Sequence, residues 1–211
     1  MTQIVHHVPE RLLVAYAAGT LPQAFSLVVA AHVSMCDQCR AALEAHHAVG
    51  GALLEDEPKS DVSGQLKADL MSRLDDAVPD EPVYRRQGPF PAPVVAAMQG
   101  RGPRWTKLGG GVKQSILSAD ATGSVRLLSI PGGQAVPDHT HGGLELTLVL
   151  QGAFADETGR FGAGDLEVAN DDLEHKPIAE AGPDCICLAA TDAPLRFRAL
   201  VPRLLQPLFR I

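Results

Sequence analysis

The order of hydrophobic and polar positions divides the chain into two parts of different character. In the first 80 residues, apolar side chains recur at helical spacing and are separated by short polar breaks. This pattern predicts four helices, at residues 9–18, 22–33, 36–51 and 62–77. The last of them carries Leu66, Leu70 and Leu74 at a spacing of four residues, with acidic residues on its other sides. Such a helix has one apolar stripe to bury, so these leucines are candidates for binding a protein partner.

From about residue 105 onward, the pattern changes to short apolar runs separated by Gly, Pro and Asp. The runs predict strands at residues 112–118, 124–130, 145–151, 153–157, 165–168, 185–191 and 195–201. Seven or more strands at this spacing are typical of a sandwich or a barrel.

Residues 79–103 join the two parts and contain six prolines, which is typical of a semi-rigid, extended linker. The predicted fold class is therefore α + β with two domains. We expect a small bundle of about four helices at residues 1–80, a proline-rich linker at 81–103 and an all-β domain at 104–211.

The charge of the chain is concentrated in one segment. The protein has 211 residues and a formal net charge of −7, and residues 37–81 hold 11 acidic against 4 basic residues. The remaining residues hold 14 of each, so this segment carries the whole imbalance. Residues 1–60 contain only Arg11, Arg40 and Lys59 as cations, too few for a surface that contacts phosphates. We therefore expect no direct binding of nucleic acid, which argues against a helix-turn-helix repressor.

A long uncharged segment raises the question of a membrane. Residues 12–36 carry no charge over 25 positions, which is long enough to span a bilayer. However, Gly19 and Pro22 interrupt the segment, and the residues before Pro9 include no Lys or Arg, as a signal peptide would require. We expect two short buried helices in a cytoplasmic protein with no membrane contact.

The first helices carry a compact set of metal-ligating residue types. His32, Cys36 and Cys39 follow one another at spacings of four and three residues, across the end of one predicted helix and the start of the next. A tetrahedral structural zinc ion requires four nitrogen or sulfur ligands, and the pair His6 and His7, just ahead of the first helix, supplies one more. The alternative is a free thiol pair beside a capping histidine.

A second set of such residues lies in the β domain. His139 and His141 alternate on an extended segment, so both side chains leave the same face, and Glu145 follows across a Gly142–Gly143 bend. Together with the flanking glycines, they match the first motif of the cupins, which are jelly-roll barrels. The histidine of the second motif comes late, at His175. These four residues are expected to bind a divalent metal, zinc in the first place, with manganese, iron or nickel as the alternatives.

Two further cysteines, Cys185 and Cys187, lie on one predicted strand with both sulfur atoms on one face. They are too close in sequence for an easy disulfide across an extended backbone. They are interpreted either as small buried hydrophobic residues or as a redox pair.

The pairing of the two parts resembles a known family, the ChrR-type zinc-dependent anti-sigma factors. The segments AYAAGTL, AFSLVVA, GGQAVPDHTHGGLELTLVLQGAF, RFGAGD and CICLAATDAPLRF carry the resemblance, which extends over essentially the whole chain. It implies a cytoplasmic inhibitor that binds an alternative, extracytoplasmic-function sigma factor one-to-one through its zinc-binding helical module. It also implies that His7 is the zinc ligand, with His6 as the alternative, and that the cupin is needed for release by singlet oxygen or related oxidants.

The alternative from another class is a metal-dependent cupin dioxygenase or isomerase with a helical appendage. It predicts turnover and additional polar groups placed over the metal. A dedicated helical zinc module would be surplus to such an enzyme, so we expect a regulator without enzymatic activity.

Overall fold

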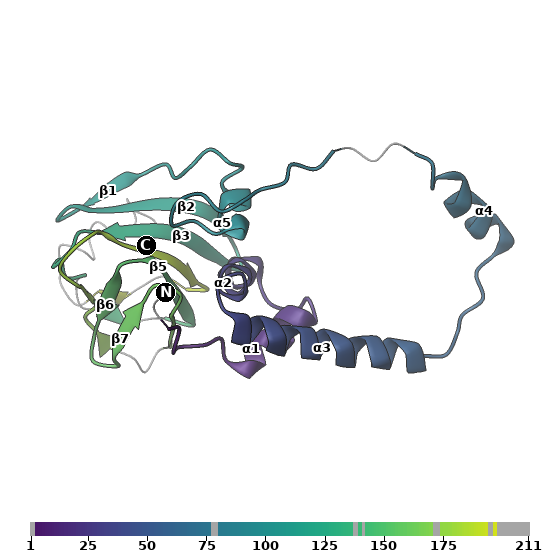
Figure 1. Ribbon diagram of the computed structural model, residues 1–211, viewed down its shortest axis with the longest axis horizontal. Helices are drawn as coiled ribbons and strands as arrows, with labels where there is room; N and C mark the ends of the chain where they lie inside the picture. The colour runs from purple at the N-terminus through teal and green to yellow at the C-terminus, as the bar shows by residue number, and fades with distance from the viewer. Residues whose placement is uncertain are drawn as a thin grey trace.

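The structure, a computed structural model, describes residues 3–76, 80–136, 139–140, 142–170, 174–193 and 196–197. Helices form the N-terminal part and antiparallel strands the C-terminal part (Figure 1), which confirms the predicted α + β class. The helices are α1 (Glu10–Ala17), α2 (Gln23–Val33), α3 (Asp37–Asp56), α4 (Gly64–Ser72) and α5 (Ala92–Ala97). Among the described residues, no helix combines the length and the apolar character that crossing a membrane requires.

The ends of the first three helices follow from local sequence. α1 ends before Gly19, whose positive φ of 68° suits a glycine, and Pro22 precedes the first turn of α2. Cys36 caps α3, with its sulfur accepting from the backbone N–H of Cys39. The predicted end of this helix at residues 50–51 is wrong, because α3 continues through both glycines to Asp56. A glycine inside a helix costs about 1 kcal/mol but does not stop it.

α4 stands apart from the other helices. Ser63 caps it by accepting a hydrogen bond from the N–H of Leu66 at 3.1 Å. Figure 1 shows α4 at a distance from the barrel, and none of its described side chains is buried. Leu66, Leu70 and Leu74 are 59 %, 63 % and 66 % exposed. α1, α2 and α3 contact one another, so the helical unit consists of three packed helices and one separate amphipathic helix.

The β part is a barrel of antiparallel strands. Its main sheet has the order β1-β2-β3-β11-β5-β8, and two smaller sheets have the orders β10-β6-β7 and β12-β4-β9. The strands are β1 (Thr106–Gly109), β2 (Val112–Asp120), β3 (Gly123–Ile130), β4 (His139–Thr140), β5 (Glu145–Gln151), β6 (Ala153–Ala155), β7 (Arg160–Gly162), β8 (Leu166–Ala169), β9 (Glu174–His175), β10 (Ile178–Ala179), β11 (Cys185–Thr191) and β12 (Arg196–Phe197).

The long strands lie where the apolar runs predict them, and β5 and β11 agree to the residue. The short strands β1, β4, β7, β9 and β10 were not predicted, because two to four residues are too few to show a periodicity. Of the strand predicted at residues 195–201, β12 covers Arg196–Phe197, and the other positions lie outside the described residues.

The predicted extended linker at residues 81–103 is wrong for its second half. There the structure has α5, with Pro91 before its first turn. α5 packs on α2, and Val94 and Val95 are fully buried. A short apolar helix that buries these valines gains more favourable free energy than an extended, exposed segment would.

The helices and the barrel share one hydrophobic core. α2 lies on the main sheet and contacts β3, β5 and β11. Phe25 and Val28 of α2 belong to the same buried cluster as Leu127, Leu146 and Leu188 of the sheet. A second, smaller cluster inside the barrel includes Phe154 and Cys187. The sheet is therefore covered by α2 on one face and encloses a small interior on the other.

Candidate metal centres

Four side chains from three elements meet at the base of the helical unit. His7 precedes α1, His32 lies in the last turn of α2, and Cys36 and Cys39 begin α3. One ligand atom from each lies within 4.8 Å of the others. Nδ1 of His7 is 3.3 Å from the sulfur of Cys36 and 3.7 Å from that of Cys39. The two rings of His7 and His32 are perpendicular, with centroids 6.2 Å apart.

His32 has the environment of a ligand rather than of an ordinary core residue. It is completely buried, and neither of its ring nitrogens has a hydrogen-bond partner among the described residues. Such an unsatisfied buried group costs about 1–3 kcal/mol, which a bound metal would remove. Burial and the neighbouring His7 lower the pKa of His32 to about 4, against an opposing effect of the Gly164 backbone. The ring is thus neutral at physiological pH, the form that coordinates metals.

The two thiols complete a donor set that fits zinc. Both are buried and unpaired in a disulfide. Burial and, to a smaller degree, the neighbouring Cys36 raise the pKa of Cys39 to about 11, against the opposing backbone of Val8. Two thiolates at this depth require a cation, and two sulfur and two imidazole ligands are a common tetrahedral zinc set.

The adjacent histidines point to different places. His7 belongs to the metal cluster, whereas Nδ1 of His6 lies 3.5 Å from a carboxylate oxygen of Asp165, and its ring packs on Phe161 with centroids 4.4 Å apart. The structure therefore brings His7, and not His6, into the cluster with His32, Cys36 and Cys39.

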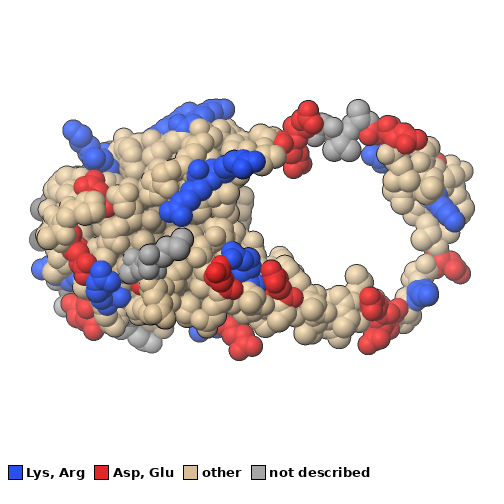
Figure 2. Space-filling view, viewed as in Figure 1, with Lys and Arg blue, Asp and Glu red and all other residues tan. Residues whose placement is uncertain are grey.

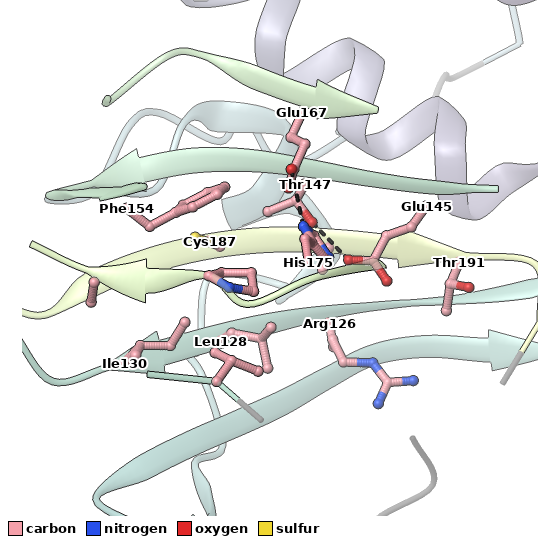
Figure 3. Close-up of a pocket in the computed structure, with 14 residues that line it drawn as sticks. Arg126, Leu128, Ile130, Glu145, Thr147, Phe154, Glu167, His175, Cys187 and Thr191 are labelled. Atoms are coloured by element: carbon pink, nitrogen blue, oxygen red, sulfur yellow. Dashed lines mark hydrogen bonds and ion pairs between the residues drawn. The ribbon is translucent and has the colours of Figure 1, made fainter. Parts of the chain in front are cut away.

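The second candidate site is a cavity of about 70 Å³ inside the barrel (Figure 3). Glu145, at the start of β5, and His175, in β9, both line it and are 9 % and 2 % exposed. The Cα atom of His139 pairs with that of His175 across β4 and β9. The side chain of His139 and the whole of His141 lie outside the described residues. Among the described residues, the structure thus brings Glu145 and His175 to one cavity and places His139 in register with His175.

Two acidic residues contact the ring of His175, and neither of them was identified from the sequence. Its Nδ1 lies 2.7 Å from Oδ2 of Asp156 and 3.2 Å from Oε1 of Glu167. Burial raises the pKa of Glu167 to about 7. Burial also acts to lower the pKa of His175, but the two carboxylates outweigh it and raise that pKa to about 9. Glu167 could have been noticed in the sequence, because it is a charged residue inside the apolar run of β8. Asp156 could not, because the residues around it are typical of a turn.

Arg126 was also missed by sequence reasoning. It lines the cavity, is 5 % exposed, and donates to Gln114 at 3.2 Å and to Ser124 at 2.7 Å. Burial lowers its pKa, whereas the charge of Glu145 acts in the opposite direction. Thr147 donates to Glu145 at 2.9 Å, so the carboxylate is oriented from its own strand (Figure 3).

The sulfur atoms of Cys185 and Cys187 lie 3.6 Å apart on β11, and both residues are buried. Cys187 lines the cavity, whereas Cys185 packs in the barrel interior near Phe154. The hydrogen bond between Cys187 and Cys185 and, after it, burial raise the pKa of Cys187 well above its ordinary value. As thiols, the two residues behave as small apolar groups within reach of the cavity.

The fold and the two clusters define a class of protein: a cupin preceded by a helical module with a histidine–cysteine metal cluster. Residues 95–193 match the family described as the ChrR cupin-like domain. The chain is 57 % identical over 211 residues to the anti-sigma-E factor ChrR of Cereibacter sphaeroides, covering 99 % of each chain. The chain belongs to the ChrR family of anti-sigma factors.

A solved structure supports the same conclusion. The crystal structure of Rhodobacter sphaeroides SigE in complex with the anti-sigma ChrR aligns with a TM-score of 0.81 at 56 % identity. The alignment covers 90 % of this chain and 100 % of that chain, so the similarity includes both the helices and the barrel.

Proposed function

We propose that this protein is an anti-sigma factor that binds one extracytoplasmic-function sigma factor and withholds it from RNA polymerase. The observation that carries the proposal is 57 % identity to a ChrR anti-sigma factor over 99 % of both chains. A relative of 56 % identity has been crystallised in complex with SigE. The proposed site of action is the cytoplasm, where sigma factors meet the polymerase, and the proposed role is regulatory and not catalytic.

The proposed sigma-binding surface is the projecting arm formed by the C-terminal half of α3 and by α4. Leu66 and Leu70 of α4 and Leu74, in the turn that follows it, are exposed to solvent, and large exposed apolar side chains in a row mark a partner surface. Acidic side chains cluster along the same arm (Figure 2). A sigma factor presents basic surfaces for DNA and polymerase, so it would be attracted to this acidic arm.

The proposed cofactor of the helical module is one structural zinc ion held by His7, His32, Cys36 and Cys39. The support is a buried histidine that has no hydrogen-bond partner in the described part of the chain and that lies beside two buried thiols. When bound, zinc would contribute folding energy to α1–α3. These helices would then position the arm that meets the sigma factor.

In the cupin, we place a divalent metal on His139, His141, Glu145 and His175, with zinc preferred over manganese, iron or nickel. Release of the sigma factor in response to singlet oxygen or related oxidants is assigned to this domain. Cys185 and Cys187 are its proposed oxidant-sensitive thiols, and Cys187 lines the cavity. A coupling of about 3 kcal/mol between cavity and arm would change sigma occupancy roughly a hundredfold.

The test is co-expression of the chain with candidate extracytoplasmic-function sigma factors, affinity purification and metal counting in the product. A one-to-one complex with one zinc ion in the helical module is expected. The matched control is the same chain with Leu66, Leu70 and Leu74 replaced by alanine, which should keep its zinc and lose the sigma factor. A chain that ignores every sigma factor, but carries redox-active iron or manganese and consumes O₂, would favour the cupin oxygenase instead.

A further inference from the structure

The structure assigns a positioning role to Asp156: its carboxylate holds the Nδ1–H of His175 and so presents the other ring nitrogen, Nε2, to the cupin metal. The inference deepens the proposed metal site of the cupin and rests on it. Asp156 is not part of the cupin motif, lies 19 residues before His175 and was not singled out by the sequence.

The two oxygens of Asp156 have separate tasks. Oδ1 accepts from the backbone N–H of Thr158 at 2.8 Å, from the Thr158 hydroxyl at 2.7 Å and from the N–H of Gly159 at 3.2 Å. These bonds tie the carboxylate to the turn between β6 and β7. Oδ2 lies 2.7 Å from Nδ1 of His175, and the side chains of both residues are at most 1 % exposed. The turn therefore fixes an anion at the back of the histidine ring.

A neutral imidazole carries one proton, and its position decides which nitrogen can bind a metal. A proton held on Nδ1 by a carboxylate leaves the lone pair on Nε2 and fixes the plane of the ring. Glu167 supports the same arrangement, with Oε1 3.2 Å from Nδ1 of His175 and 3.4 Å from the hydroxyl of Thr158. His175 lies between Glu167 and Glu145 in the cavity (Figure 3), so its ring is directed from a carboxylate network into the proposed site.

The substitution Asp156→Asn separates the two tasks. Asparagine has one acceptor oxygen, which the N–H groups of the turn would retain, so its amide N–H would face His175. That N–H would require an acceptor at Nδ1 and would move the ring proton to Nε2, where it blocks metal binding. Outer partners of this kind change metal affinity by about ten- to a hundredfold.

The chain contains its own matched control. Asp120 sits in the β2–β3 turn with the same Asp-x-Thr-Gly sequence, and its Oδ1 accepts from the Thr122 N–H at 2.7 Å and hydroxyl at 2.6 Å. Asp120→Asn makes the same chemical change in the same kind of turn, away from the cavity. Glu167→Gln is a second test variant that leaves the turn intact.

The experiment equilibrates each full-length variant with zinc against a graded series of chelators and counts zinc per chain. Glu145→Gln serves as the reference without the cupin ion, so its difference from wild type isolates that ion. We expect Asp156→Asn to weaken retention of the cupin ion by about ten- to a hundredfold, Glu167→Gln less, and Asp120→Asn not at all. In ¹⁵N NMR of the zinc-loaded chains, His175 should carry its single proton on Nδ1 in wild type and lose that state in Asp156→Asn, a change that general destabilisation would not produce.

Three results would overturn the assignment. The first is that Asp156→Asn retains zinc as tightly as wild type. The second is that wild type and Glu145→Gln hold the same number of ions. The third is that the ion survives Glu145→Gln but is lost in Asp156→Asn, which would make Asp156 itself a ligand. Sigma binding is measured on the same samples. Its absence would contradict the proposed function, while the metal counts would still decide the role of Asp156.

Discussion

Two neighbouring histidines illustrate how single residues are assigned to different tasks. Residues 5–7 cross a turn of the barrel, where Asp165 accepts hydrogen bonds from the N–H groups of Val5 and His6. His6 packs on Phe161 and faces Asp165, and His7 enters the cluster with Cys36. The histidine pair therefore lies at the boundary between the two parts of the protein, with one ring on each side.

At the level of single residues, the substitutions His6→Gln and His7→Gln form a matched pair. His7→Gln should lower the zinc content of the full-length chain by one ion and destabilise α1–α3, because structural zinc contributes its binding energy to folding. His6→Gln should leave the zinc content unchanged. Metal counting together with thermal unfolding checks both. Zinc loss from His6→Gln, with retention in His7→Gln, would reverse the proposed assignment.

Among the helices and strands, α4 has a sequence that predicts a buried apolar face, but its surroundings leave that face exposed. Its leucine spacing is that of a helix with a face to bury, but the face is exposed in the free chain. A helix of nine residues gains little stability by itself and depends on packing, so it requires a partner to cover it. The acidic residues on the same arm indicate a basic partner.

The corresponding prediction concerns Leu66→Ala and Leu70→Ala. Each should weaken sigma binding about tenfold or more, because a buried leucine contributes roughly 1.5–3 kcal/mol to an interface. The thermal stability of the free chain should not change, since both side chains are exposed. Titration calorimetry with the sigma factor and a melting curve measure the two effects. Lys67→Ala, on the same helix, is the control; equal losses from all three variants would argue against an apolar interface on α4.

The whole molecule is held together across its two parts. Beyond the core that α2 shares with the sheet, Asp165 of the barrel accepts the N–H groups of Val5 and His6 at 2.8 and 2.9 Å through Oδ1. Its Oδ2 accepts from Gly162 at 2.9 Å. Gly164 has a positive φ of 98°, and a Cβ added there would come within 2.5 Å of the end of the Ile4 side chain, so this turn favours glycine. A barrel turn thus holds the segment that carries the proposed ligand His7.

Asp165→Asn should loosen this contact. Asparagine cannot accept with both of its terminal atoms, so one group of N–H donors would lose its partner at a cost of about 1–3 kcal/mol. Hydrogen exchange at Val5 and His6 should quicken, and zinc should leave the helical site faster on chelation. Asp120→Asn, in a turn that does not touch the N-terminal segment, is the control. Unchanged exchange at both amides would show that the contact does not hold the segment.

The stability that the Asp165 contact contributes depends on pH, and the pKa of Asp165 gives the direction of that dependence. Although burial opposes it, hydrogen bonds from His6, Val5 and Gly162 hold the pKa of Asp165 below its ordinary value of 3.8. A carboxyl group with a lowered pKa in the folded state stabilises the protein above its ordinary pKa and loses that contribution as the pH falls further. Asp165→Asn should therefore flatten the decline of stability below about pH 4.

A deletion tests how independent the two parts are. The proposed function predicts that a chain ending near Pro89 inhibits its sigma factor constitutively. In the structure, such a chain loses α5 and the sheet that cover α2, and it exposes Val28 and Val29, which are fully buried in the intact protein. We expect the fragment to bind the sigma factor but to melt at a lower temperature than the full chain. A folded fragment that fails to bind would contradict the modular interpretation.

Much of this protein could be inferred from the sequence because its signals are local. The helix of α2, the long strands β5 and β11, and the set His32, Cys36 and Cys39 are encoded in residues close together along the chain. Periodicity and ligand spacing report on such neighbours directly. The short strands and the helix α5 escaped prediction, since contacts made by residues far away in sequence stabilise them.

Other features were decided by the tertiary structure alone. The sequence could not separate His6 from His7 on residue type, because only the path of the backbone past Asp165 directs one ring to each side. It also gave no reason to connect Asp156 with His175, which the pairing of strands brings to 2.7 Å. By itself, the sequence determined the fold class, the helices and long strands, and the residues available to bind metal. The tertiary structure decided which of them meet, because contacts between distant segments form only once the barrel has closed and α2 has packed on it.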